Sequence, residues 1–161
     1  MYSYSLKNNN SANIIKSIIK KSGCDIICLN ETFLKRNETI IIEGYTSLCH
    51  NRKNINPKAC RGSGGVAILV RTNILETYYI QIIDNSFENI QWLKLIDSDQ
   101  QGNNITICSC YLPREGSSRG NKEQEFFDKL KETIHNHIDE NLIIICSDFN
   151  SRIRKLKEAE G

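Results

Sequence analysis

A run of five apolar residues, Leu142 to Cys146, ends abruptly at the polar sequence Ser147-Asp148-Phe149-Asn150. Short apolar runs of this kind, rich in isoleucine and valine, predict buried β-strands. Comparable runs occur at 25–29, 64–70, 75–83, 90–96 and 104–111, and one or two short strands broken at Gly44 are expected within 39–49. The density of the 25–29 run predicts a central strand that is buried on both faces. Most of the core is therefore expected to be β-structure.

Two segments carry the helical period instead. The first, 11–22, places four isoleucines on one stripe, with Ser11 as N-cap and Gly23 as terminator (Ile14, Ile15, Ile18 and Ile19). In the second, from 121 to about 139, apolar residues recur every four positions, and Asn121 and Gln124 are suited to a capping box (Phe126, Leu130, Ile134 and Ile138). Because several strands follow one another without regular βαβ alternation, the order of elements predicts a mixed α/β (α+β) fold.

Composition restricts the class of protein. The chain has 161 residues, of which 39% are hydrophobic and 25% charged, as expected for one globular domain over residues 1–161. No run approaches the roughly 18 apolar residues of a membrane span, and the first residues lack the apolar stretch of a signal peptide. Seven cysteines without a Cys-x-x-Cys pair argue against zinc and favour buried, reduced thiols in an intracellular protein. The net charge of +2 neither requires nor excludes nucleic acid.

The tetrapeptide 147–150 offers chemistry at a strand end. Side chains two apart on an extended backbone point the same way, so Asp148 and Asn150 are expected to project together while Phe149 turns into the core. A carboxylate that deprotonates water beside an amide that donates to phosphate is a hydrolytic pair. The alternative interpretation is a strand followed by an Asx turn.

Two further polar clusters follow apolar strands, at Asn30-Glu31 and at Tyr111. Strand ends of a layered fold often gather into one cleft. There, Glu31 is a candidate ligand for Mg²⁺, which often takes only one or two carboxylates, and Tyr111 is a candidate hydrogen-bond donor to phosphate. The alternatives are a surface or helix-start glutamate and a half-buried strand tyrosine.

Basic residues near these strand ends are candidate substrate contacts. Arg114, Arg119 and Lys122 can follow a phosphate backbone, although a solvated loop with scattered charge gives the same pattern. The glycines of 61–65 precede a strand rather than a helix, so a close approach of backbones is expected there instead of a phosphate-binding loop.

Taken in order, five stretches resemble the endonuclease/exonuclease/phosphatase superfamily, and most closely the endonuclease domain of non-LTR (LINE-type) retrotransposons. These stretches are Cys24-Asp-Ile-Ile-Cys-Leu-Asn-Glu-Thr32, Arg61-Gly-Ser-Gly-Gly-Val-Ala-Ile-Leu-Val70, Phe87-Glu-Asn-Ile-Gln-Trp-Leu-Lys-Leu95, Ile107-Cys-Ser-Cys-Tyr-Leu-Pro113 and Ile145-Cys-Ser-Asp-Phe-Asn-Ser-Arg152. Each is weak alone, but five in family order are a strong signal.

The resemblance implies a four-layer sandwich of two packed β-sheets flanked by helices, dependence on Mg²⁺ or Mn²⁺, and DNA nicking. It implies that Glu31 is the metal ligand, Tyr111 the active-site tyrosine, Asp148 the water-activating aspartate and Asn150 a phosphate contact. Candidate substrate-binding residues are Asn30, Arg114, Arg119 and Arg152. A reverse transcriptase domain in the parent polypeptide and a nuclear location are further implications. The alternatives are another phosphodiesterase or phosphatase of the superfamily, or a non-catalytic binding module.

Two departures from the family pattern lead to further expectations. The family's first strand ends in an asparagine, whereas the stretch Tyr2-Ser-Tyr-Ser-Leu6 has a tyrosine there. The family also closes with an Asp-His pair that follows later strands, and the sequence after Asn150 has neither residue. A domain shortened at both ends, with an incomplete second sheet and impaired hydrolysis, is therefore expected.

Overall fold

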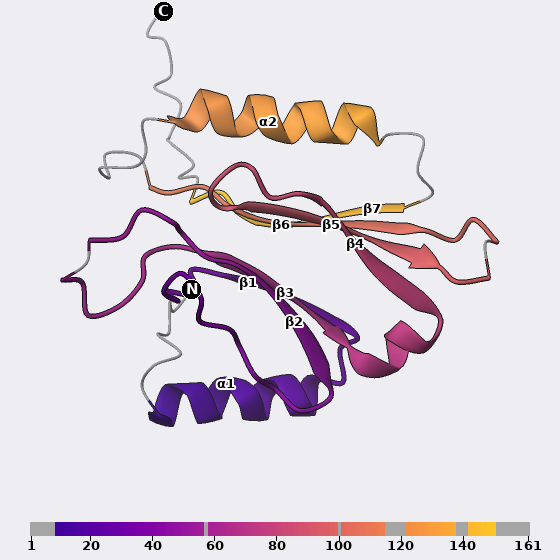
Figure 1. The fold of residues 1–161 in the computed structure, drawn as a ribbon, viewed down its shortest axis with the longest axis horizontal. Coiled ribbons are helices and arrows are strands. Elements are labelled where there is room, and N and C mark those ends of the chain that lie inside the picture. The colour runs from indigo at the N-terminus through magenta and orange to yellow at the C-terminus, as the bar shows by residue number, and fades with distance from the viewer. Residues whose placement is uncertain (1–8, 57, 100, 115–121, 138–141, 151–161) are drawn as a thin grey trace, which may run out of the picture.

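Two β-sheets lie face to face between two helices (Figure 1). The computed structural model describes residues 9–56, 58–99, 101–114, 122–137 and 142–150. The elements in chain order are α1 (Asn9–Ser22), β1 (Ile26–Asn30), β2 (Tyr45–His50), β3 (Val66–Arg71), the 3₁₀ turn η1 (Thr72–Glu76), β4 (Tyr78–Asp84), β5 (Ile90–Asp97), β6 (Ile105–Tyr111), α2 (Glu123–Asn136) and β7 (Leu142–Asp148).

The two sheets differ in topology. The first has the order β1-β3-β2 and is antiparallel throughout, and the second has the order β4-β5-β6-β7. In the second sheet β6 and β7 pair in parallel, while the other pairs are antiparallel. A parallel pair needs a long crossover, and α2 lies within the connection from β6 to β7. The carboxyl ends of β6 and β7 therefore meet at one edge, with Tyr111 opposite Asp148.

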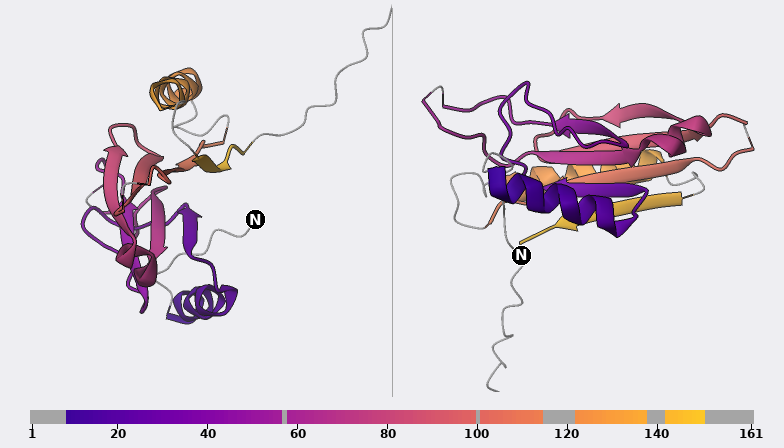
Figure 2. Two further views of the ribbon diagram at one scale, coloured as in Figure 1. Left: turned by 90° about the vertical axis from the view of Figure 1, so that its right-hand side faces the viewer. Right: turned by 90° about the horizontal axis from the view of Figure 1, so that it is seen from below.

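Three apolar clusters define four layers. Alternate residues of β3 and β5 pack between the sheets, including Ile68 and Leu93. On the outer face of the first sheet, Leu69 packs against Ile19 of α1. On the outer face of the second sheet, Trp92 packs with Phe126 of α2. Figure 2 shows the two helices on opposite outer sides of the molecule. The mixed α/β fold with two sheets and two helices agrees with the prediction, and its layers follow the order helix, sheet, sheet, helix.

The burial of two strands was predicted wrongly. The run 25–29 was expected to be a central strand, but β1 lies at the edge of its sheet and all five of its residues are half-buried. The last apolar run likewise forms an edge strand among the described residues, and Leu142, Ile144 and Ile145 are each more than a third exposed. Apolar density reports a preference for burial, whereas position in a sheet depends on pairing between distant segments.

The helix signals were only partly correct. Gly23 ends α1 with φ +65, as predicted, but α1 begins at Asn9, so Ser11 lies inside the helix and is not its cap. The isoleucine stripe is split, because Ile19 is buried while Ile14 and Ile18 are 58% and 60% exposed. The capping-box role of Gln124 is wrong, since its amide donates to Asp128 at 2.8 Å. The remaining capping and stripe positions, 121 and 138, lie outside the described residues.

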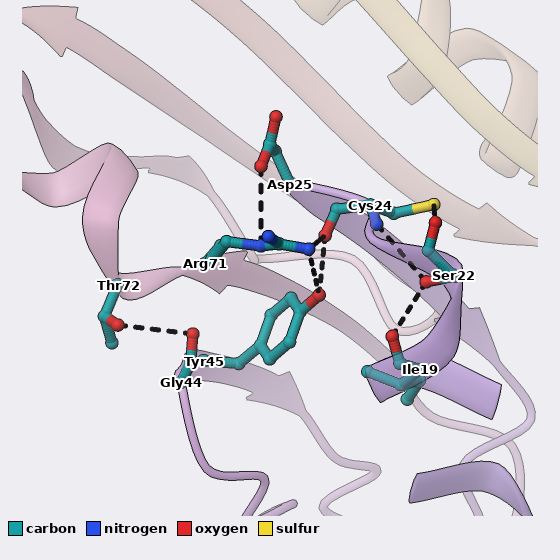
Figure 3. A network of polar contacts seen from close by, with 8 residues as sticks. All are labelled: Ile19, Ser22, Cys24, Asp25, Gly44, Tyr45, Arg71 and Thr72. Atoms are coloured by element: carbon teal, nitrogen blue, oxygen red, sulfur yellow. Dashed lines mark hydrogen bonds and ion pairs between the residues drawn. The ribbon is translucent and has the colours of Figure 1, made fainter. Parts of the chain in front are cut away.

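The ends of the first sheet away from the candidate site are tied together by polar contacts (Figure 3). The Tyr45 hydroxyl donates to the Cys24 carbonyl at 2.6 Å. Arg71 donates to the same carbonyl at 3.2 Å, lies 3.4 Å from Asp25, and stacks over the Tyr45 ring. These contacts anchor the start of β1 to β2 and β3.

The seven cysteines are all free thiols. The prediction that they are buried is correct for only some of them. Cys108 and Cys110 are buried in β6, while Cys24 and Cys60 are exposed. In the part of the chain that the structure describes, neither helix is long and apolar enough to cross a lipid bilayer.

Candidate active site

Three strand ends from the two sheets bring the predicted residues together. Glu31 follows β1, Tyr111 ends β6, and Asp148 ends β7. Tyr111 and Asp148 are opposite residues of the parallel ladder, so their Cα atoms are neighbours. Residues 31, 111 and 148 are far apart in sequence, and the face-to-face packing of the sheets makes them one cluster.

The segment around Glu31 is held against the glycine-rich stretch 61–65. Thr32 and Phe33 donate backbone hydrogen bonds to Gly65 and Gly64 at 3.1 and 2.8 Å. A Cβ on Gly65 would lie 2.6 Å from the Thr32 hydroxyl, so only glycine permits this approach. The prediction that these glycines allow close backbone contact is confirmed. Glu31 has φ +54, a conformation unusual for glutamate, and this pairing holds it there.

The central contact of the site joins the two sheets. The Tyr111 hydroxyl donates to Glu31 Oε1 at 2.8 Å. Burial, this hydrogen bond and the negative charges of Glu31 and Asp148 raise the pKa of Tyr111 above its ordinary value, while Arg114 partly offsets the rise. The phenol is therefore protonated at neutral pH and remains a hydrogen-bond donor. The same balance of charges shows that both carboxylates act on one hydroxyl.

The turn after β7 combines the two interpretations of the tetrapeptide. The Asn150 backbone N–H donates to Asp148 Oδ1 at 3.0 Å, and Asn150 has φ +46, so the segment is an Asx-type turn. The expectation of an extended backbone through Asn150 is therefore wrong, although Asp148 and Asn150 do remain adjacent. Phe149 packs against the aromatic cluster under α2, as predicted. The Asn150 amide also donates to the Leu112 carbonyl at 2.8 Å, and within the described part of the chain its second N–H group has no hydrogen-bond partner.

The four residues predicted to bind substrate lie in different surroundings or outside the described part of the chain. Arg114 Nε lies 3.4 Å from Asn150 Oδ1, which places its guanidinium beside the turn. Asn30 faces the other sheet, where its Oδ1 accepts a hydrogen bond from the Ser109 hydroxyl at 3.2 Å. Asn30 is thus a structural link behind Glu31 in this structure. Arg119 and Arg152 lie outside the described residues.

Residues 2–154 match the Endonuclease/Exonuclease/phosphatase family. The chain belongs to this family. Solved structures with the same fold include the Xenopus laevis APE2 catalytic domain, with 18% identity, 87% of this chain and 54% of that chain covered, and a TM-score of 0.62. The human nocturnin catalytic domain with bound sulfate has 15% identity and a TM-score of 0.58, and the match covers 88% of this chain and 56% of that chain. Truncated Caenorhabditis elegans TDP2 has 17% identity and a TM-score of 0.50, and the match covers 90% of this chain and 58% of that chain.

The chain spans little more than half the length of these three structures, and identities below 20% establish the shared fold only. No curated protein sequence matches the chain. The family is one of Mg²⁺-dependent phosphodiesterases that act on nucleic acid, so its site must be compatible with a hard cation.

The oxygen donors at this family site fit such a cation. Within the described residues, no group of three or more His, Cys, Asp and Glu side chains gathers as a metal cluster. Mg²⁺ does not need one, because it keeps several waters and often binds one or two carboxylates plus substrate phosphate. Glu31 uses Oε1 to accept from Tyr111, and its Oε2 has no hydrogen bond among the described residues. Glu31 would hold the cation, with Asp148 as the second carboxylate nearby.

A cavity of about 390 Å³ adjoins the site where α2 covers the ends of β5 and β6. Its walls include Leu112 and Pro113, which directly follow Tyr111, and Phe126 of α2. The buried Arg52 guanidinium also lines it, 3.0 Å from Glu88 and 3.3 Å from Asn89 Oδ1.

Two of these residues support the site without having been predicted. The Asn89 carbonyl accepts the Tyr111 backbone N–H at 2.9 Å, and Asn89 has the left-handed φ of +69. Sequence reasoning missed Arg52 because it belongs to a polar loop with no motif of its own. A buried arginine next to a left-handed asparagine has no sequence signature.

Proposed function

We propose that this chain is a divalent-metal-dependent phosphodiester hydrolase of the DNA endonuclease type, with impaired hydrolysis, from a non-LTR retrotransposon-like reading frame. One observation carries the proposal. The hydrogen bond from Tyr111 to Glu31 links the end of β1 to β6, where Asp148 pairs beside it. A carboxylate for a cation, a protonated phenol and a second carboxylate thus share one strand-end site, which is the set that phosphodiester hydrolysis needs.

The roles of the chain's own residues follow from their contacts. In this proposal Asp148 accepts a proton from water as the water oxygen forms its bond to phosphorus. The P–O bond to the leaving oxygen then breaks, and that oxygen is protonated by solvent. A cation held by Glu31 would polarise the phosphoryl oxygen. Tyr111, kept protonated by its surroundings, donates a hydrogen bond and fixes the Glu31 carboxylate.

Asn150 and Arg114 supply the remaining contacts to the phosphate. The free N–H of the Asn150 amide can donate to a non-bridging oxygen, and Arg114 lies at the same turn. Because Asn150 is also bound to the Leu112 carbonyl and the Asp148 carboxylate, its position is fixed before a ligand arrives.

The first test separates metal binding from hydrolysis. Mn²⁺ binding is measured by electron paramagnetic resonance, and nicking by the conversion of supercoiled plasmid to open circles with Mg²⁺ or Mn²⁺. Glu31→Gln is expected to weaken Mn²⁺ binding, whereas Asp148→Asn is expected to leave it within a few-fold. Asp148→Asn should lower the nicking rate by about 10²–10⁴-fold, the usual contribution of a positioned general base. Glu76→Gln, an exposed glutamate in η1, is the matched control and should change neither measurement.

The outcomes distinguish the candidate functions. Nicking that survives both site substitutions contradicts the proposed residues. Metal-dependent cleavage of a small phosphodiester without plasmid nicking overturns DNA as the substrate and favours another phosphodiesterase of the family. DNA binding without any cleavage, unaffected by Asp148→Asn, favours a non-catalytic binding module. The proposed partnership with a reverse transcriptase domain is tested separately, by expressing the natural reading frame and identifying the polypeptide that contains this chain.

A further inference from the structure

Two loops next to Glu31 form a surface that carries five positive charges. One loop continues from Glu31 after β1 and the other follows β2, and the second loop extends beyond the sheets (Figure 1). We call this surface the cationic face and define it by five residues: Lys35, Arg36, Lys53, Lys58 and Arg61. All but Lys35 are exposed.

The charges of the cationic face are not neutralised locally. Among the described residues, none of its five side chains forms an ion pair, whereas lysines elsewhere do, such as Lys20 with Glu43 and Lys129 with Asp84. The Glu38 carboxylate in the first loop accepts the backbone N–H of Lys35 at 2.8 Å. Because the whole chain has a net charge of only +2, this face is a local excess of positive charge. Such an excess attracts a polyanion.

The two loops are held in place by direct contacts between them. The Asn51 amide donates to the backbone carbonyls of Lys35, Arg36 and Glu38 at 3.0, 3.2 and 2.6 Å. The Arg36 guanidinium donates to the Lys53 carbonyl at 3.0 Å. These bonds close the first loop onto the second and fix where its lysine and arginine emerge.

The second loop is fixed on the side of Glu31. Gly62 donates to the Phe33 carbonyl at 3.0 Å, and the Arg61 guanidinium stacks over the Phe33 ring at 4.8 Å from its centroid. Phe33 is two residues from Glu31, so the cationic face begins beside the carboxylate proposed to hold the metal. Cations fixed before binding lose less conformational entropy when a ligand docks.

We propose that the cationic face binds the sugar–phosphate backbone of a nucleic acid strand whose neighbouring phosphate lies at Glu31 and Asp148. This proposal rests on the proposed function, since it extends the same substrate beyond the site. Successive phosphates of one strand are rows of single negative charges, and exposed Lys and Arg neutralise them without reading sequence. An anionic membrane is a poorer fit, because only one large exposed apolar side chain, Ile41, lies in these two loops. The other seven among the described residues lie elsewhere (Ile14, Ile18, Tyr79, Ile82, Leu142, Ile144 and Ile145).

The test is the salt dependence of binding. Fluorescence anisotropy of labelled duplex and single-stranded oligonucleotides is measured in EDTA, so that no cleavage occurs, from 50 to 200 mM salt. The variant is K53Q/K58Q, whose two lysines are exposed. The control is K16Q/K21Q, which removes the same charge from exposed positions on α1.

The expected change follows from counterion release. Losing two phosphate contacts lowers the slope of log affinity against log salt by about 1.8 on duplex and about 1.4 on single strands. On duplex, a fourfold rise in salt should then weaken the wild type about twelvefold more than K53Q/K58Q. The control should keep the wild-type slope. Equal slopes for K53Q/K58Q and its control overturn the proposal. The same variants are also compared for binding to phosphatidylserine vesicles, and a loss of binding that is seen only with the vesicles overturns it too.

The failure of this proposal is distinguishable from failure of the proposed function. If D148N and wild type show the same absence of hydrolysis while K53Q/K58Q lowers the salt slope, the cationic face stands and the hydrolase assignment falls. If hydrolysis depends on Asp148 but the slope does not change, the reverse holds. Wild-type urea midpoints for both double variants establish that neither result reflects unfolding.

Discussion

Substituting Gly65 tests how the fold holds the glutamate of the site. Gly65 has φ +87, and a methyl group on its Cα would lie 2.6 Å from the Thr32 hydroxyl oxygen. Thr32 is buried, immediately follows Glu31, and donates its backbone N–H to the Gly65 carbonyl at 3.1 Å. A change at Gly65 therefore acts directly on the loop that positions Glu31.

Two costs add in Gly65→Ala. A non-glycine residue in the left-handed region costs about 1–2 kcal/mol. Overpacking a buried contact costs about 1–3 kcal/mol, and Thr32 relieves it poorly because β-branched side chains have few rotamers. The free energy of unfolding should fall by about 2–5 kcal/mol, against a total of about 5–15 kcal/mol for a domain of ordinary stability.

Gly44 provides the matched control. It has φ +82, and a Cβ there would meet nothing within 4 Å, so Gly44→Ala carries only the backbone cost of about 1–2 kcal/mol. Urea unfolding followed by Trp92 fluorescence reports both losses, since Trp92 is fully buried. Gly65→Ala should exceed Gly44→Ala by about 1–3 kcal/mol.

A double-mutant cycle with Thr32→Ala assigns the excess to one contact. Removing the Thr32 hydroxyl should recover part of the loss in Gly65→Ala, with a coupling of at least about 1 kcal/mol. Equal losses at Gly65 and Gly44, or strict additivity with Thr32→Ala, would refute the close-approach argument.

The remaining two predictions concern stability. Burial lowers the pKa of His50, so the unfolded chain binds the proton more readily than the folded chain. The contribution of neutral His50 to the free energy of unfolding should be fully present above about pH 6.5 and should decline as the pH falls toward the lowered pKa of the folded state. His50→Gln should reduce this decline in urea midpoints between pH 7.5 and 5, and an unchanged pH profile would contradict the role of His50. Tyr45→Phe removes a hydroxyl that donates to Cys24 and accepts from Arg71, and it should cost about 0.5–1.5 kcal/mol by urea unfolding. Tyr79→Phe, at an exposed position, should cost nothing, and equal losses at the two tyrosines would argue against the network.

Local patterns predicted the elements and several orientations. The strand runs lie within a few residues of β3, β5 and β6, because short β-branched stretches bounded by turn residues have few other conformations. The close backbone approach at the glycines of 61–65 was also correctly expected, and Phe149 was correctly assigned to the core. These are properties of neighbouring residues, which a single sequence displays.

Contacts between distant segments were beyond such patterns. The exposure of Ile14 and Ile18 depends on how α1 is rotated on its sheet, and the edge positions of β1 and β7 depend on which strands pair. Arg52 became a buried wall of the cavity only because the loop after β2 folds against Glu88 and Asn89. No local period encodes these pairings.

The amino-acid sequence by itself determined which segments become strands and which strand ends carry acid, amide and phenol groups, since side-chain type and backbone preference are local. Only the tertiary structure decided that Tyr111 would donate to Glu31, 80 positions away along the chain. The physical reason is that the apolar faces of two sheets must pack against each other, and that packing sets which strand ends meet.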